Sequence, residues 1–339
     1  MFLLPDTFAR NRNWRLSPGT TLANWRVPPV DLAVSHSFTT PSLQFSGHET
    51  FPLRQLWLRK AFDSIANATP FAPRSVFSDE ESIARFGVGR NMVTSIRHWS
   101  LASGFMHETE GGYAPTDLAT KLLSKNGFDP YLEQPATVWL IHWKLAGIGI
   151  KSTTWWYLFN CIVQQTFDRE SLFRALKSYT ASVPYKVSDS TLTRDIDVCL
   201  ASYLPKTANA ASMEDAAEPV LAELPLLQQH MGMKGTFSFR RGAKPTLPDA
   251  LFTYALVEFW ERYNHASVLS FERITHDYGS PGRVFKLDEY TVGEKVVALE
   301  HSTKGMLRWT DTAGVRQVSK AAGFDPEILK SRLLEAMYG

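Results

Sequence analysis

The sequence feature that most constrains the fold is an early run of two helical segments, a glycine turn and a hairpin. The spacing predicts a first helix that begins after Ser78, with Glu81 completing a capping box, and a second helix over 90–103. Residues 87–89 supply the turn between them, and residues 105–114 read as a small hairpin. This order is typical of a winged helix-turn-helix, so we expect one in the N-terminal part.

The second of these helices carries the residues expected to contact DNA. Met92, Ile96 and Trp99 are spaced to face inward. The opposite face is expected to present Arg90, Asn91, Thr94, Ser95 and either Arg97 or His98. Because these residue types suit base edges and phosphates, we predict DNA contact from Arg90, Asn91, Thr94 and Arg97. The alternative is a packing or dimer module whose charges are merely solvated.

Tryptophan marks the centre of the chain. Four of the ten tryptophans fall within residues 139–156, where helices are expected to begin at Pro135 and Thr153. Aromatic side chains at helical spacing usually fill a core, which is the favoured interpretation for most of them. A platform on which one or two unstacked bases rest is the alternative.

These patterns predict a mainly α protein in four parts. Residues 1–43 are proline-punctuated and read as an extended arm, and residues 44–127 form the winged-helix domain. Residues 128–235 are expected to form a central, aromatic-rich helical domain. Residues 236–339 are expected to form a helical part with small β-hairpins that repeats the winged-helix theme, although no convincing sequence repeat is found.

Charge and cysteine content exclude several classes of protein. Lys and Arg number 36 against 34 Asp and Glu, so the chain is not a nonspecific basic coat for nucleic acid. Two cysteines exclude a disulfide framework and favour a reducing compartment, the cytoplasm. No stretch approaches the ~18 apolar residues that a membrane helix needs. No phosphate loop, dinucleotide fingerprint, zincin motif or nucleophile elbow is found either.

The densest group of reactive side chains is Gly47–Arg54. His48 can shuttle protons, Glu49 can act as a base or metal ligand, and Arg54 can clamp a phosphate, which together suit phosphodiester chemistry. We therefore predict His48, Glu49 and Arg54 as the catalytic set. The alternative is a buried His-Glu-Arg network at the start of a helix that Thr50 caps.

Three further groups are weaker candidates. Glu49, Asp129, Glu133 and His142 could hold a divalent cation, Mg²⁺ or Mn²⁺, although a lone histidine on an apolar helix face is more often a core residue. Residues 188–197 read as a capped helix with ion pairs. Residues 279–286 combine glycines with Arg283 and Lys286 and could seat a DNA phosphate; a plain turn is the alternative.

Six long segments, in this order, resemble one known family. They are FSGHETFPLRQLWLRKAFD, GVGRNMVTSIRHW, DPYLEQPATVWLIHWKLA, TTWWYLFN, SPGRVFKLDEYTVGEKV and DTAGVRQV. The family is the SspB-like group, the B component of bacterial Ssp systems, which place phosphorothioate sulfur on one DNA strand. The resemblance spans roughly residues 44–320 and leaves the N-terminal arm unexplained.

The resemblance implies a DNA-nicking endonuclease of a bacterial DNA modification and defence system. The nick would open the backbone so that sulfur can be inserted. The implied partners are DNA, a cysteine desulfurase, an ATP pyrophosphatase-like sulfur-transfer protein and an ATPase, and a homodimer is also considered. Two other functions stay open: a non-catalytic DNA-binding adaptor of the same system, and a scaffold that binds proteins through its helix-turn-helix modules.

Overall fold

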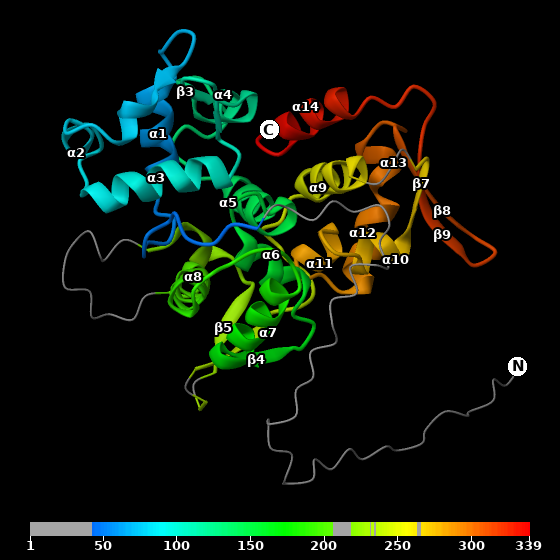
Figure 1. Cartoon of the computed structure of the whole chain (residues 1–339). Coiled ribbons are helices and arrows are strands. Elements are labelled where there is room, and N and C mark those ends of the chain that lie inside the picture. Colours follow the sequence, from blue (N-terminus) through cyan, green and yellow to red (C-terminus); the bar gives the residue numbers. More distant parts are fainter. Residues whose placement is uncertain (1–42, 206–217, 231, 234, 263–265) are drawn as a thin grey trace, which may run out of the picture.

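The computed structural model describes residues 43–205, 218–230, 232–233, 235–262 and 266–339. Helices predominate, and three small antiparallel sheets accompany them (Figure 1), so the expectation of a mainly α fold is confirmed. The arm over residues 1–43 lies outside the described residues, apart from its last residue.

One order of elements occurs three times along the chain. Each unit has a helix, a strand, at least two helices and then a pair of antiparallel strands. The sheets have the strand orders β1-β3-β2, β4-β6-β5 and β7-β9-β8, so the last strand of each unit always lies in the middle. The same connectivity therefore recurs in segments that share no recognisable sequence repeat.

The first unit follows the order of elements expected for residues 44–127, with different helix starts. Its elements are α1 (Trp57–Ile65), β1 (Ala72–Pro73), η2 (Arg74–Phe77), α2 (Ser82–Phe86), α3 (Arg90–Ala102), β2 (Met106–Glu108), β3 (Gly112–Pro115) and α4 (Asp117–Leu123). Leu56 has a positive φ of 65°, so α1 begins five residues after Pro52 and Thr50 does not cap it. Ser78 ends the 3₁₀ turn η2 by donating its N–H to Ser75, so the predicted capping box is wrong.

The second unit contains the central aromatic helices. Its elements are α5 (Pro135–His142), the π-helix η3 (Trp143–Ile148), α6 (Thr153–Asn160), β4 (Thr166–Asp168), α7 (Arg169–Ala181), α8 (Asp189–Ser202), η4 (Val220–Glu223), β5 (Leu227–Gln229) and β6 (Thr236–Phe239). β6 pairs with both β4 and β5. A domain boundary at residue 236 would separate β6 from both neighbours, so we place the boundary after β6.

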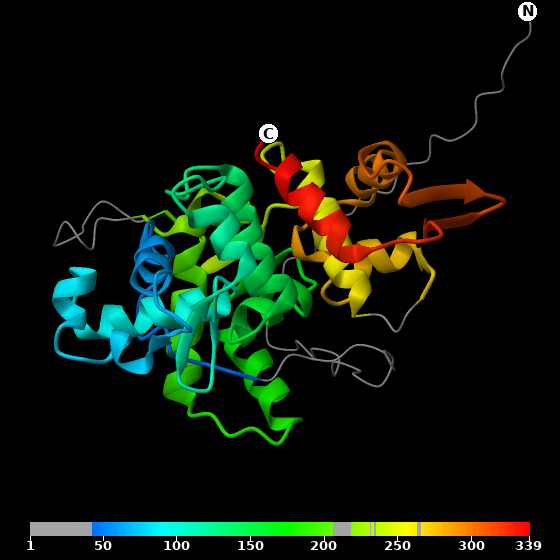
Figure 2. The same cartoon turned by 90° about the horizontal axis from the view of Figure 1, so that it is seen from above.

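The third unit ends the chain. Its elements are α9 (Asp249–Glu261), β7 (Val268–Ser270), α10 (Phe271–His276), α11 (Pro281–Val284), α12 (Glu289–Val297), α13 (Leu299–Ser302), β8 (Leu307–Thr312), β9 (Val315–Lys320) and α14 (Pro326–Ala336). The β8–β9 hairpin projects from the body, whereas α14 folds back along α9 (Figure 2). Residues 279–282 are more than a turn, because Ser280 accepts from the N–H of Arg283 and starts α11.

The tryptophans of α5, η3 and α6 lie in the core. Trp139, Trp143, Trp155 and Trp156 are each at most 2% exposed. Burying side chains of this size supplies a large hydrophobic stabilisation, and it removes their faces from any nucleic acid. The core interpretation is therefore confirmed for these four rings, and the alternative of a base-stacking platform is wrong for them.

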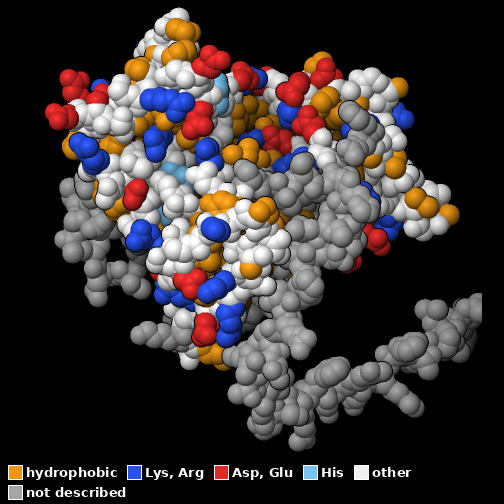
Figure 3. Space-filling model, in the orientation of Figure 1, with side chains coloured by type: hydrophobic (Ala, Val, Ile, Leu, Met, Phe, Trp, Pro, Cys, Tyr) orange, Lys and Arg blue, Asp and Glu red, His pale blue; other side chains and the backbone are white. Residues whose placement is uncertain are grey.

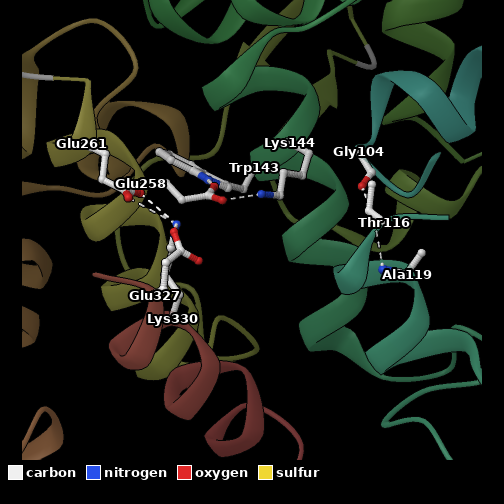
Figure 4. A network of polar contacts seen from close by, with 9 residues as sticks. All are labelled: Gly104, Thr116, Ala119, Trp143, Lys144, Glu258, Glu261, Glu327 and Lys330. Carbon is white, nitrogen blue, oxygen red and sulfur yellow. Dashed lines mark hydrogen bonds and ion pairs between the residues drawn. The ribbon is translucent and has the colours of Figure 1, made fainter. Parts of the chain in front are cut away.

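Polar contacts tie the third unit to the other two. Glu258 of α9 accepts hydrogen bonds from the indole of Trp143 and from Lys144, and both residues belong to η3 (Figure 4). Lys121 of α4 donates to the Ser331 hydroxyl of α14 at 3.4 Å. Within the third unit, Lys330 of α14 pairs with Glu261 of α9. At the C-terminus, the Tyr338 ring stacks on Phe128 with centroids 5.5 Å apart. Within the described residues no helix is both long and apolar enough to cross a membrane.

Candidate functional site

The loop that carries the predicted catalytic residues is held in an unusual backbone conformation. Ser46, Gly47 and Glu49 have positive φ values of 69°, 95° and 53°. Non-glycine residues rarely adopt this region of φ, so contacts with surrounding residues must hold the backbone of the loop there. At Gly47 a Cβ would lie 2.6 Å from Nδ1 of His98, so only glycine allows this approach to α3.

Two contacts from α3 fix the loop further. The hydroxyl of Ser95 donates to the His48 carbonyl at 2.7 Å. The indole of Trp99 donates to the Phe51 carbonyl at 3.0 Å. Ser95 and His98 are therefore buried against the loop, and the prediction that either of them faces outward is wrong.

His48 is paired with an acid that the sequence analysis assigned to a different role. Its Nε2 lies 2.6 Å from Oδ1 of Asp195 on α8, and both residues are almost completely buried. Asp195 also accepts from the N–H of Ser46 at 2.8 Å and from the hydroxyl of Thr154 at 2.5 Å. The loop is thus bound to α6 and α8 of the second unit. It joins the first two units.

Asp195 was missed as a partner of His48. The sequence analysis interprets residues 188–197 as a capped helix and assigns Asp195 to its local ion pairs. However, Leu192, Ile196 and Cys199 flank it at helical spacing and are buried. An acidic residue inside an apolar helix stripe needs a buried partner, and that signal was present in the sequence.

The surroundings of His48 are dry and aromatic. Its ring stacks on Trp99 at a centroid distance of 5.8 Å and meets the His98 ring edge-on at 5.5 Å. Burial, and then the neighbouring His48, lower the pKa of His98 to about 3, so His98 stays neutral. Nδ1 of His48 has no hydrogen-bond partner among the described residues. A histidine held by a carboxyl group at one nitrogen can accept a proton at the other.

The three predicted catalytic side chains do not converge on one point. Arg54 is 8% exposed, and its guanidinium lies 5.5 Å from the Phe51 ring centroid and 5.4 Å from that of Trp57. Glu49 is half-buried, and its side chain makes no hydrogen bond or ion pair with a described residue. The His-Glu-Arg network proposed as the alternative does not form either, because His48 pairs with Asp195.

The outer face of α3 is polar and basic. Arg90 and Asn91 are exposed, and Thr94 and Arg97 are half-buried. The side chains of Arg90 and Arg97 form no ion pair with a described residue. Lys and Arg side chains lie over the region of α2 and α3, with Asp and Glu side chains among them (Figure 3). The four residues predicted to contact DNA therefore lie on one helix and are available to a ligand.

The chain is similar to known proteins over most of its length. Residues 45–338 match the family described as "Protein of unknown function (DUF4007)". The chain belongs to the DUF4007 family. Two SspB crystal structures are similar over 88% of both chains, one with magnesium ion bound (TM-score 0.77, 26% identity) and another (TM-score 0.76, 27% identity). This DUF4007 protein is SspB-like. No protein with a curated description matches it significantly.

The four predicted metal ligands of this DUF4007 protein do not form a site. Both carboxyl oxygens of Asp129 accept hydrogen bonds from residues at the start of α5. His142 is fully buried, with Nδ1 bonded to the Tyr203 hydroxyl and Nε2 to the Val284 carbonyl. No group of three or more potential ligands occurs in the part of the chain that the structure describes. The set Glu49, Asp129, Glu133 and His142 is therefore corrected: Asp129 and His142 have structural roles.

The two predicted phosphate ligands near α11 also differ in accessibility. Lys286 is 2% exposed, and its ammonium donates to the Phe159 carbonyl at 2.7 Å. It cannot reach a DNA phosphate in this structure, so its assignment to direct contact is corrected. Arg283 is half-buried, and its guanidinium lies 4.5 Å from the Tyr278 ring centroid.

Proposed function

We propose that this protein is the DNA-binding and DNA-nicking subunit of an Ssp-type phosphorothioation system. The observation that carries the proposal is the outer face of α3 on an SspB-like fold. Four side chains on this face are accessible to a ligand: Arg90, Asn91, Thr94 and Arg97. The likeness to SspB supports membership in the Ssp system, and the α3 face supports the DNA contact.

The order of elements in the first unit, two helices followed by a β-hairpin, supports a winged helix, a fold that binds DNA. In that fold the second helix of the helix-turn-helix enters the major groove, and the β-hairpin lies beside the phosphate backbone. We assign α3 as the recognition helix and β2–β3 as the wing. Arginine and asparagine are the side chains that pair bidentately with guanine and adenine.

The first unit is a better candidate for this contact than the third. The corresponding helix of the third unit, α12, exposes Glu289 and Glu294. Carboxyl groups would repel a phosphate backbone, whereas Arg90 and Arg97 attract it. We therefore assign DNA contact to the first unit and not to the third.

For the nicking step we assign His48 as the group that accepts the proton of the attacking water. Asp195 would hold the ring at Nε2, leaving Nδ1 as the acceptor. His48 is 1% exposed, so the Ser46–Thr50 loop must move before a phosphodiester reaches it. The loop is bonded to α3 through Ser95, which couples that movement to DNA binding on α3.

A divalent cation is part of this proposal because a magnesium-bound SspB structure is similar to the chain. Of the four predicted ligands, Glu49 and Glu133 have accessible carboxyl groups that bond to no described residue, and Glu49 is the one next to His48. Mg²⁺ is often held by one or two carboxyl groups together with waters and substrate phosphates. The cation would supply charge stabilisation at the phosphate.

The second candidate function is a non-catalytic adaptor that binds DNA for the same system. The deep burial of His48 and of Arg54 favours it, because both side chains are largely shielded from solvent in this structure. In both cases the proposed partners are DNA, a cysteine desulfurase, an ATP pyrophosphatase-like protein and an ATPase. The chain could also form a homodimer.

A plasmid assay separates the two candidates. The purified full-length protein is incubated with supercoiled plasmid and Mg²⁺ or Mn²⁺, beside a His48→Ala variant and an Arg90→Ala/Arg97→Ala variant. If the protein is a nickase, the wild type converts the supercoiled plasmid to open circles, and both variants lose that activity. Binding without open circles supports the adaptor. Nicking that survives His48→Ala rejects the assignment of His48.

A further inference from the structure

The turn between η3 and α6 presents a cation that lies outside the α3 face. Lys151 has a positive φ of 56°, and its side chain is 29% exposed. A non-glycine residue keeps such a backbone only where the surrounding structure holds it there. The Ser152 hydroxyl does so, because it donates to the carbonyls of Leu145 at 2.8 Å and Ile150 at 3.2 Å. The fold therefore fixes the place from which the Lys151 side chain reaches solvent.

This turn lies beside the loop that carries His48. Gln44, just before the loop, donates its N–H to the Thr153 hydroxyl at 2.7 Å and accepts from the Thr153 N–H at 3.3 Å. The Trp155 ring, also in the first turn of α6, has its centroid 5.8 Å from that of the His48 ring. Lys151 comes two residues before α6, so a positive charge of the second unit is placed next to the loop.

The His98 ring of α3 connects this charge to the α3 face. Burial is the main cause that lowers the pKa of His98 to about 3, and the charge of His48 is the next. Lys151 and then Arg97 lower that pKa further, so both cations lie close enough to act on the ring. The same ring packs on the loop, because a Cβ at Gly47 would lie 2.6 Å from its Nδ1. Lys151 and Arg97 therefore belong to one region around the loop, although they come from different units.

The wing β2–β3 of the first unit approaches the same lysine. Nζ of Lys151 lies 4.0 Å from Oε1 of Glu108 on β2, and the Glu108 side chain is 47% exposed. This separation is long for an ion pair, and pairs between accessible groups contribute little stability. Lys151 forms no ion pair with any other carboxyl group of a described residue. A stronger anion can therefore replace Glu108 at little cost.

We infer that Lys151 binds a phosphate of the DNA backbone, and that Glu108 of the wing holds its ammonium until DNA takes that place. The inference rests on the proposed function and extends it, because the wing of a winged helix lies beside the phosphate backbone. A carboxyl group there repels a phosphate, whereas the lysine attracts it. The DNA surface therefore includes the second unit as well as Arg90 and Arg97 of α3. A backbone that contacts both Arg97 and Lys151 passes close to the loop that carries His48.

Two substitutions at position 151 separate charge from packing. Lys151→Gln removes the charge and keeps most of the side-chain length, whereas Lys151→Arg keeps the charge. The matched control is Lys177→Gln, which removes an exposed cation of α7 that is already paired with Asp189 at 2.7 Å. None of these variants changes the α3 face or the predicted catalytic residues. Thermal melts show that each variant is folded.

Each variant is titrated with a labelled DNA duplex at several salt concentrations, and binding is followed by fluorescence anisotropy. Lys151→Gln should bind about five- to tenfold more weakly at about 0.1 M salt, because one phosphate contact is lost. The slope of log K against log salt should become shallower by about 1. Lys151→Arg and Lys177→Gln should bind as the wild type does.

A second pair of variants tests the role of Glu108. Glu108→Gln removes the carboxyl group that competes with the phosphate, so it should bind DNA more tightly than the wild type. Glu110→Gln is the control, because Glu110 is exposed on the same wing and forms no ion pair with a described residue. The gain from Glu108→Gln should exceed that of the control. In the Lys151→Gln background it should shrink to the value of the control, because no ammonium is left to compete for.

The outcomes separate this inference from the proposed function. If the wild type binds the duplex and Lys151→Gln matches Lys177→Gln, the phosphate contact is rejected and the proposed function stands. An equal loss in Lys151→Gln and Lys151→Arg would show a packing role and would also reject the contact. If Glu108→Gln gains no more than Glu110→Gln, the role of Glu108 is rejected. A wild type that does not bind the duplex overturns the proposed function and this inference with it.

Discussion

His48 Nε2 and Asp195 Oδ1 lie 2.6 Å apart, although 147 positions separate the two residues in the sequence. The contact joins the first unit to α8 of the second unit. It is buried, and Asp195 satisfies the Ser46 N–H and the Thr154 hydroxyl as well. One carboxyl group therefore holds the conformation of the loop and the orientation of the histidine.

Removing that carboxyl group should destabilise the protein strongly. Asp195→Ala leaves three donors without this acceptor, two of them buried, and we expect the free energy of unfolding to fall by about 2–4 kcal/mol. Asp195→Asn keeps an oxygen in place and should cost about 1 kcal/mol. Urea unfolding of both variants measures the difference. Equal losses would mean that packing, and not hydrogen bonding, sets the role of Asp195.

The α3 face should account for most of the salt dependence of DNA binding. Arg90→Ala/Arg97→Ala is expected to weaken binding and to lower the slope of log K against log salt by about 1 to 2, because up to two phosphate contacts are lost. Fluorescence anisotropy with a labelled duplex measures this. Arg174→Ala/Lys177→Ala is the charge-matched control, and an equal loss in that control would show that only net charge matters.

Much of this arrangement can be predicted from the sequence. Helix α3 follows from the spacing of its apolar residues, and Arg90 and Asn91 lie outside, where that spacing places them. The burial of the four central tryptophans also follows from composition and periodicity. These features depend on local pattern and on side-chain size, which the sequence states directly.

The pairings between distant segments could not be predicted in the same way. Asp195 meets His48 only because α8 packs behind the loop, and β6 joins β4 and β5 only because the chain returns to the second unit. Lys286 looks like a surface lysine in the sequence, yet its ammonium lies 4.0 Å from the Phe239 ring centroid. Tertiary packing decides each of these. The helical spacing around Asp195 signals that it needs a buried partner, but it does not identify His48 as that partner.

The stability of the protein should fall as the pH is lowered below about 6.5. Burial is the main cause that lowers the pKa values of His98 and His142 to about 3. In this range the unfolded chain takes up protons that the folded state does not, so acid favours unfolding. Between pH 7.5 and pH 5.5 each histidine should contribute a loss of about 1.4 kcal/mol.

Urea unfolding at the two pH values measures this loss. The two histidines together cause part of the loss in the free energy of unfolding between the two pH values. His98→Gln and His142→Gln should each remove about half of that part. His301→Gln is the control, because that ring is exposed and should leave the pH dependence as it is in the wild type. A wild-type pH dependence in the His98 and His142 variants would contradict the assignment.

The contact between Glu258 and Lys144 should be the ion pair on which stability depends most (Figure 4). Burial alone would raise the pKa of Glu258, but Lys144 and the hydrogen bonds from Lys144, Trp143 and Tyr254 hold it below its ordinary value. Glu258→Ala leaves the Lys144 cation and the Trp143 N–H in a largely buried place without that acceptor. We expect the free energy of unfolding to fall by about 3–5 kcal/mol.

Glu170→Ala is the control. It breaks the exposed pair with Arg174 and should cost less than about 0.5 kcal/mol. Denaturant unfolding of both variants, followed by tryptophan fluorescence, compares them directly. Similar small losses would show that solvent reaches the Glu258 site and that α9 is held to η3 by apolar packing alone.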